Sequence, residues 1–151
     1  MSFFDSFRVS ATGMTAQRLR MDTISQNIAN VNTTRTDSGG PYRRKTVVFE
    51  EITNGRNFRR HLDQYLDDYR STTSSAGGVK ASKIIEDQSP FIDIYDPSHP
   101  DANEEGYVKM PNVNAVEEMT NLISANRSYE ANITAFNATK GMASRALEIG
   151  R

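Results

Sequence analysis

The sequence predicts an α+β protein in which long N- and C-terminal helices pack as a coiled-coil-like pair, with a small β-rich middle domain. Residues 1 to about 32 and Asn114 to about Leu147 repeat apolar side chains at alternating steps of three and four, and no proline interrupts either run. This spacing is typical of a helix that buries one stripe against another helix. Between the two runs lie short stretches rich in β-branched and aromatic residues, which favour strands.

The N-terminal helix presents a stripe in which seven of nine residues are apolar. The stripe comprises Phe3, Phe7, Ser10, Met14, Gln17, Met21, Ile24, Ile28 and Val31. An asparagine-rich run from Asn27 to Thr34 follows, and asparagine favours helix ends because it tolerates the left-handed conformation. The run Asp37 to Pro41 then predicts a firm break.

Four strands are expected in the middle of the chain, arranged as a small sheet or a pair of hairpins. They are Tyr42–Glu51, Val79–Ile85, Phe91–Tyr95 and Tyr107–Met110. Asn57–Arg70 shows helical spacing, but its charges oppose the helix dipole. We expect a weak helix or a mobile insertion there, and a surface loop at residues 96–106.

The C-terminal helix begins with a predicted capping box of Asn114 and Glu117, and at 1.5 Å per residue it spans roughly 50 Å. Many of its residues are weak helix formers, such as Asn and Thr, so we expect packing to supply stability. Its stripe comprises Ala115, Met119, Leu122, Asn126, Tyr129, Ile133, Phe136, Lys140, Ala143 and Leu147. Asn126 and Lys140 either set register within a seam or face water. The two stripes form either an intramolecular core or an assembly interface.

Composition indicates a chain that folds but completes its core with outside help. Leu, Ile, Val and Phe number 30 of 151 residues, close to the level below which chains struggle to fold alone. The net charge of -1 does not indicate a highly charged disordered protein. Cysteine is absent, and the sequence predicts neither a cleavable signal peptide nor a membrane span.

Residues that could support chemistry do not form a recognisable site. His61 and His99 lie near no nucleophile motif, and the acidic residues of the 96–106 loop lack calcium-loop spacing. The basic run Arg43–Lys45 favours a solvated face or salt bridges between subunits over phosphate or nucleic-acid binding. We therefore expect no catalytic, metal or cofactor site, no small-molecule substrate and no nucleic-acid partner.

Several motifs resemble those of bacterial flagellar axial proteins, which include rod, hook and hook-associated proteins. The match covers nearly the whole chain except about residues 53–75, and it is closest to the proximal-rod members. It includes the Asn27–Thr34 run, Gly106–Val113 and Ser124–Asn132. The motif residues are Asn27, Ala29, Asn30, Asn32, Thr33, Tyr107, Pro111 and Asn112.

The resemblance implies a helical axial domain of residues 1–34 plus 112–151, and a β-rich domain of residues 41–111 with an insertion at about 53–75. It implies a non-enzymatic subunit of the proximal rod, a hollow shaft that transmits torque from the membrane ring to the hook. Its partners would be copies of itself, other rod proteins, a base-of-rod adaptor and the membrane ring. Export would use the flagellar type III apparatus, and the subunit would act in the basal body outside the cytoplasmic membrane.

Under that expectation, the assembly seam comprises Phe3, Phe7, Met14, Met21, Ile24, Ile28, Val31, Met119, Leu122, Asn126, Tyr129, Ile133, Phe136 and Leu147. The alternative hypothesis is a cytoplasmic helical adaptor or export chaperone that binds a partner helix in its groove.

Overall fold

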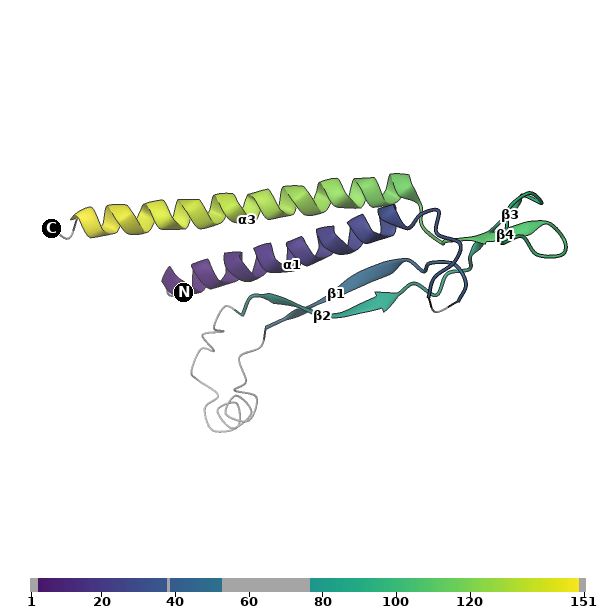
Figure 1. Cartoon of the computed structure of the whole chain (residues 1–151). Helices are drawn as coiled ribbons and strands as arrows, with labels where there is room; N and C mark the ends of the chain where they lie inside the picture. Colours follow the sequence, from purple (N-terminus) through teal and green to yellow (C-terminus); the bar gives the residue numbers. More distant parts are fainter. Residues whose placement is uncertain (1–2, 38, 53–76, 150–151) are drawn as a thin grey trace, which may run out of the picture.

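A computed structural model describes residues 3–37, 39–52 and 77–149 and confirms the predicted fold class. The elements are α1 (Phe3–Ala29), β1 (Lys45–Glu51), β2 (Val79–Glu86), β3 (Ile92–Tyr95), β4 (Tyr107–Met110) and α3 (Ala115–Ile149). The molecule is elongated, with α1 and α3 side by side and β3–β4 at one end (Figure 1). The predicted helix at Asn57–Arg70 lies outside the described residues.

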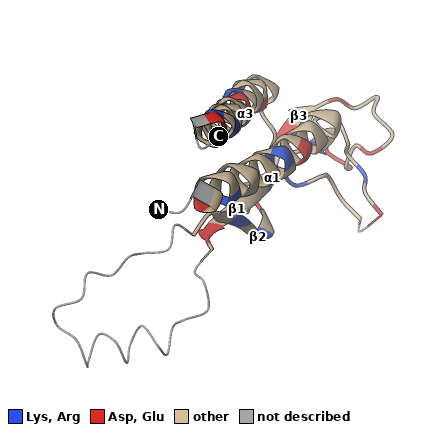
Figure 2. Ribbon diagram, turned by 90° about the vertical axis from the view of Figure 1, so that its left-hand side faces the viewer, with Lys and Arg blue, Asp and Glu red and all other residues tan. Residues whose placement is uncertain are grey.

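Helix α1 forms the middle of three layers. It contacts α3 on one side and both strands of the β1–β2 hairpin on the other (Figures 1 and 2). Ala16 and Ile24 on α1 are only 3% and 6% exposed, as expected for a helix covered from two sides. Among the described elements, α3 contacts α1 alone, so most of its circumference faces outward.

Two separate antiparallel hairpins make up the β structure. Strand β1 pairs with β2 with a register shift between Val48 and Phe49, and β3 pairs with β4 from Ile92–Met110 to Tyr95–Tyr107. All four strands appear close to their predicted positions, but β1 begins three residues after the predicted start.

The late start of β1 has a hydrogen-bonding cause. The amide of Tyr42 donates to the carbonyl of Thr33 at 3.1 Å, and the amide of Arg44 donates to the side-chain oxygen of Asn112 at 2.9 Å. Because these two donors are used outside the sheet, residues 42–44 are not part of β1, and only the Arg44 carbonyl continues the pairing, accepting the Asp87 amide at 2.8 Å.

Side chains cap both facing helix ends. The side-chain amide of Asn30 donates to the backbone carbonyl of Gln26 at 2.9 Å, which satisfies a carbonyl in the last turn of α1. At the start of α3, Asn114 Oδ1 accepts the backbone amide of Val116 at 3.0 Å, which confirms the Asn114 half of the predicted capping box but not the reciprocal bond to Glu117. The Glu117 carboxylate lies 3.7 Å from Arg44.

The core is small and partly polar. Its largest fully buried side chains are Glu118, Asn27 and Pro111. Large apolar residues are exposed on every element except β1, with Phe4 and Leu147 at 78% and 76%. This distribution supports the expectation that burial is completed by contacts outside the chain. Over the described residues, no helix combines the length and apolarity needed to cross a membrane.

Candidate assembly surfaces

The stripe of α3 that packs against α1 again alternates steps of three and four. We call it the packed stripe. Its residues are all buried or partly buried, and they are Glu118, Leu122, Ala125, Tyr129, Asn132, Phe136, Thr139 and Ala143. Its contacts run antiparallel to α1. The rings of Phe136 and Phe7 meet edge to face at 4.7 Å, and Asn132 lies against Gly13.

As an intramolecular contact, this stripe differs in part from the predicted one. Leu122, Tyr129, Phe136 and Ala143 belong to both, but Met119 and Ile133 are 53% and 36% exposed. Leu147 is 76% exposed, and Asn126 and Lys140 face water as the second interpretation of those residues required.

The physical reason is the close approach of the two helices. A Cβ at Gly13 would stand 2.8 Å from the Asn132 side-chain oxygen, and Ser10 beside it is also buried. Asn132 of the packed stripe lies opposite Gly13, the short residues Ala125 and Thr139 elsewhere on the stripe are 0% and 8% exposed, and the larger Leu122, Tyr129 and Phe136 are partly buried. Met119 and Ile133 lie outside this stripe.

The remaining large apolar residues of α3 form an uncovered surface, which we call the outer face. It comprises Val116, Met119, Ile123, Ile133, Met142 and Leu147, each at least 36% exposed. Where the outer face meets α1, a shallow groove of about 460 Å³ is lined by Met21, Leu122, Ile123, Asn126, Arg127 and Glu130. Three of these, Met21, Leu122 and Asn126, are predicted seam residues.

The predicted seam residues of α1 lie mostly toward the interior. Ile24 is buried, and Phe7, Met14, Met21 and Ile28 are partly buried. Val31 is also partly buried but lies beyond the end of α1. The side chain of Phe3 lies outside what the structure describes. Whether these residues take part in assembly remains a prediction.

A buried polar cluster joins both helices to the first hairpin; we call Asn27, Tyr42, Arg44, Asn112 and Glu118 the polar clasp. The amide of Asn27 donates to Glu118 Oε2 at 2.8 Å and to the backbone oxygen of Lys45 at 2.9 Å. Its oxygen accepts the Lys45 amide and the Tyr42 hydroxyl, both at 2.9 Å. Both donors and both acceptor positions of Asn27 are thus filled, so its burial at 1% exposure is compensated.

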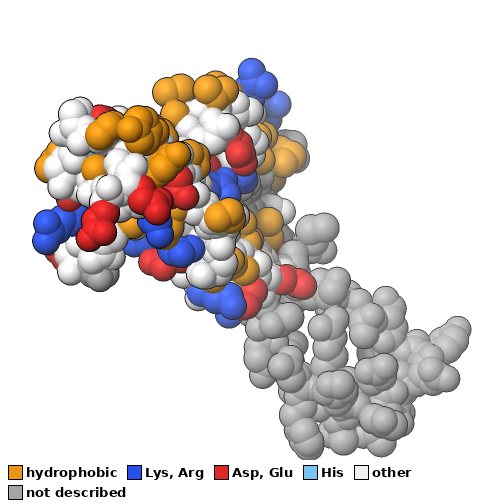
Figure 3. Space-filling model, turned by 90° about the vertical axis from the view of Figure 1, so that its right-hand side faces the viewer, with side chains coloured by type: hydrophobic (Ala, Val, Ile, Leu, Met, Phe, Trp, Pro, Cys, Tyr) orange, Lys and Arg blue, Asp and Glu red, His pale blue; other side chains and the backbone are white. Residues whose placement is uncertain are grey.

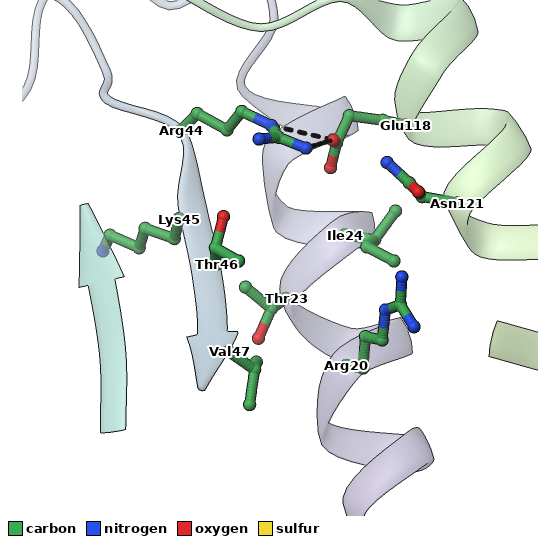
Figure 4. A pocket seen from close by; sticks show the side chains of 9 residues that line it. All are labelled: Arg20, Thr23, Ile24, Arg44, Lys45, Thr46, Val47, Glu118 and Asn121. Carbon is green, nitrogen blue, oxygen red and sulfur yellow. Dashed lines mark hydrogen bonds and ion pairs between the residues drawn. The ribbon is translucent and has the colours of Figure 1, made fainter. Parts of the chain in front are cut away.

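Arg44 neutralises the buried carboxylate of Glu118. Its Nε and Nη2 donate to Glu118 Oε1 at 2.9 and 2.6 Å, and Figure 4 shows the side chain reaching from the start of β1 to α3. Two further carboxylates, of Asp87 and Glu117, lie 3.6 and 3.7 Å from the guanidinium. Burial alone would lower the pKa of Arg44, but these acidic partners raise it above its usual value.

Tyr42 remains a neutral donor in the clasp. Burial raises the pKa of its hydroxyl, and the charges of Glu118 and Glu86 raise it further. The recess beside the clasp holds only about 60 Å³. Ligand pockets usually hold ~300–1,000 Å³, so the clasp itself is structural.

Six of the family-motif residues make identifiable contacts or are buried, inside or outside the clasp. Asn112 accepts the Arg44 amide and donates to the carbonyls of Asp87 and Ser89 at 3.2 Å, tying the entry of α3 to the end of β2. The other motif residues have these positions: Asn27 lies in the clasp, Asn30 caps α1, Thr33 bonds to Asn30, Tyr107 meets Tyr95 edge to face, Pro111 is fully buried, and Ala29 and Asn32 are exposed.

Sequence reasoning missed Arg44 and Glu118. Arg44 belonged to a basic run expected to be solvated or to bind another subunit, yet it pairs within the chain. Its neighbour Arg43 stacks over the Phe91 ring at 4.4 Å. Patterns between nearby residues cannot predict this pair, because its members are 74 residues apart in the chain. Across the described part of the chain, no three His, Asp or Glu side chains gather as a metal site.

Comparisons with known proteins match both ends and the full length. Residues 7–35 match the family model "Flagella basal body rod protein", and residues 104–149 match "Flagellar basal body rod FlgEFG protein C-terminal". The "Flagellar basal-body rod protein FlgC" of Bacillus subtilis is 51% identical, with all of both chains covered. The protein of the same name from Borreliella burgdorferi is 47% identical over 99% of this chain and 98% of its own.

A more distant relative, the FlgC of Escherichia coli O157:H7, is 36% identical over all of both chains. Full-length identity at this level, together with the matches of both terminal helices, shows shared family membership. The chain therefore belongs to the FlgC family of flagellar basal-body rod proteins.

Proposed function

We propose that this chain is a non-enzymatic proximal-rod subunit that assembles with its own copies and with other rod proteins into the hollow torque-transmitting shaft. The observation that carries the proposal is the outer face of α3. Val116, Ile123 and Met142 are 74%, 57% and 62% exposed on a helix whose only described element contact is α1. Large apolar side chains left exposed along a helix in this way support an interaction surface.

The energetics suit assembly on a growing rod. Each large apolar side chain that a neighbour buries contributes roughly 1.5–3 kcal/mol, so several on one helix offset the weak helix formers of α3. A chain that completes its core only in the lattice remains suited to unfolded passage through the type III export apparatus. The polar clasp links the β1–β2 hairpin to the helix pair, so force on one layer is transmitted to the others.

A second function is favoured by the groove between α1 and α3. Its Met21, Leu122 and Ile123 lining would accept an amphipathic helix, as in a cytoplasmic adaptor or export chaperone. An adaptor would remain soluble in the cytoplasm and would not be a fixed component of the basal body.

Mass spectrometry of purified hook–basal bodies separates the two functions. We expect the uncleaved chain there, in fixed proportion to the other rod proteins. If the chain is missing from basal bodies and abundant in the soluble cytoplasmic fraction, the rod proposal fails and the adaptor is favoured.

A further inference from the structure

Arg20 on α1 is a partly buried cation without a partner. Over the described part of the chain, its side chain makes no hydrogen bond, ion pair or ring contact. The other described Lys and Arg side chains that are partly buried, Arg43, Arg44 and Lys45, each contact an acidic or aromatic side chain. On the surface shown in Figure 3, basic side chains commonly lie beside acidic ones. Arg20 is therefore an exception that needs an explanation.

Asn121 on α3 is a second unpartnered polar side chain at the same place. It is partly buried, and its side-chain amide makes no hydrogen bond to a described residue. Arg20, Ile24 and Asn121 all line the recess beside the polar clasp. Figure 4 shows the guanidinium of Arg20 directed toward Ile24 and Asn121, while the side chain of Lys45 points away from them. A guanidinium has five N–H donors and an amide has two, so the recess presents donors without an acceptor.

Glu118 also lines the recess but is not the missing acceptor. Its Oε1 accepts two hydrogen bonds from Arg44, and its Oε2 accepts one from Asn27. Within the described ranges no ion pair joins Glu118 to Arg20. Because Arg44 already neutralises Glu118, the charge of Arg20 remains uncompensated. The acceptor must therefore come from outside the chain.

The size of the recess limits what can enter it. Its volume is about 60 Å³. Since roughly 10–15 Å³ of such space holds one water molecule, the recess admits a group of a few heavy atoms and no larger ligand. A functional group at the tip of a side chain or a very small anion has this size.

The donors and the charge fit a carboxylate. The planar fork of a guanidinium matches the two oxygens of a carboxylate, and the amide of Asn121 supplies a further donor. One uncompensated positive charge balances a monoanion, whereas the negative charge of Glu118 in the lining disfavours a phosphate dianion. We propose that Arg20 and Asn121 form a binding site for a single carboxylate group.

Two sources supply this chemistry. One is an acidic side chain of a neighbouring protein in the basal body, and the other is a small carboxylate anion in solution. The site is formed by two helices of one chain, so binding itself does not depend on the proposed rod function. Only the first source does.

Titration of the full chain with sodium acetate tests the site. The NMR signals of the Arg20 Nε–H group and the Asn121 side-chain amide are expected to shift and to saturate with acetate. Sodium chloride, sodium sulfate and sodium phosphate at the same ionic strength are expected to shift them less. Arg20→Gln is expected to abolish the response of the Asn121 amide, and Arg20→Lys is expected to retain part of it.

The matched control is Arg18→Gln, which removes an exposed guanidinium two residues away and is expected to leave the acetate response unchanged. Circular dichroism checks that each variant is folded. An acetate response no larger than that to chloride, or one that persists in Arg20→Gln, would overturn the site. Such a result would mean that the stem of Arg20 only covers apolar surface, as long basic side chains often do. A stronger response to phosphate would overturn the assignment to a carboxylate.

Carbodiimide coupling in purified basal bodies identifies the source. Arg20→Lys places an amine at the site, and carbodiimide joins an amine to an adjacent carboxylate as an amide while taking up the released water as a urea. A product between this position and an Asp or Glu of a neighbouring protein, absent from the Arg18→Lys control, would establish the side-chain source. Acetate binding without that product would establish the small anion.

Coupling of the Arg20→Lys amine to Glu118 of the same chain would overturn the proposal, because Glu118 would then be the acceptor. Absence of the chain from basal bodies would contradict the rod function and would leave the result of the acetate titration unaffected.

Discussion

At the scale of single residues, the unusual feature is a glutamate at the centre of the core. Glu118 is 1% exposed, and its carboxylate accepts two hydrogen bonds from Arg44 and a third from Asn27. Replacing a buried ion pair by apolar residues is often harmless, but removing one partner leaves the other charge uncompensated. The clasp is therefore sensitive to single truncations.

We expect Glu118→Ala to lower the free energy of unfolding by about 3 kcal/mol, because Arg44 loses its two short hydrogen bonds and keeps only the longer contacts to Asp87 and Glu117, and one Asn27 donor is left unpaired. Glu117→Ala is the matched control, since Glu117 lies beside the same guanidinium at 3.7 Å but is 63% exposed. It is expected to change stability by less than about 1 kcal/mol. Urea unfolding of the full chain, followed by circular dichroism, measures both; equal losses would show that the buried pair has no special weight.

At the scale of elements, the helix pair depends on short side chains at the contact. Gly13 on α1 and Gly141 on α3 are both helical, but their surroundings differ. A Cβ at Gly13 meets Asn132 at 2.8 Å, whereas nothing lies within 4 Å of a Cβ at Gly141. A side chain at Gly13 thus requires Asn132 to shift, whereas one at Gly141 enters open space.

Gly141→Ala is expected to stabilise the chain by about 0.5–1 kcal/mol through helix propensity alone. Gly13→Ala gains the same propensity but displaces the Asn132 side chain, which bonds to the Ser128 carbonyl at 2.8 Å. It is expected to be neutral or destabilising. Thermal melts compare the two, and an equal gain at both sites would mean that the helices do not approach closely at Gly13.

The two faces of α3 predict two different failures. Ile133→Asp places a carboxylate on the outer face, where water reaches it, and is expected to leave the monomer folded at a cost of about 1 kcal/mol while stopping motility. Ala125→Asp buries the same group at a position of 0% exposure and is expected to lower the free energy of unfolding by more than about 4 kcal/mol, which unfolds the chain. Soft-agar motility and circular dichroism separate them, and a motile Ile133→Asp strain would remove the outer face from assembly.

At the scale of the whole molecule, one end is joined and the other is open. The clasp ties α1, α3 and β1 together near Asn27, while α3 projects beyond α1 at its C-terminal end. Local unfolding starts where buried contacts are fewest. The helix pair should therefore open from the end opposite the clasp.

In the dilute monomer, trypsin is expected to cut after Lys140 and Arg145 well before it cuts after Arg20 near the clasp, and assembled rods are expected to be protected at all three. Mass spectrometry of a digestion time course gives the order. Uniform protection of the monomer at every concentration would favour the adaptor function.

Deleting residues 1–20 is expected to abolish assembly, because it removes Phe7 and Gly13 from the helix pair while leaving Asn27 in place. Asp67→Ala, outside the described residues, is expected to be tolerated. Incorporation into basal bodies is the measurement, and rods built from the truncated chain would refute the role of α1.

The sequence by itself determined the two terminal helices, the four strands and the Asn114 cap, because periodicity, β-propensity and capping act between residues close in the chain. It also marked Asn27 and Asn112 through their motifs. Only the tertiary structure decided which stripe of α3 faces α1 and that Arg44 pairs with Glu118. Hydrophobicity favoured Met119 and Ile133 as packed residues, but the contacts of Glu118 with Asn27, of Asn132 with Gly13 and of Phe136 with Phe7 turn another stripe of α3 toward α1. Those contacts join distant segments, and local patterns carry no information about them.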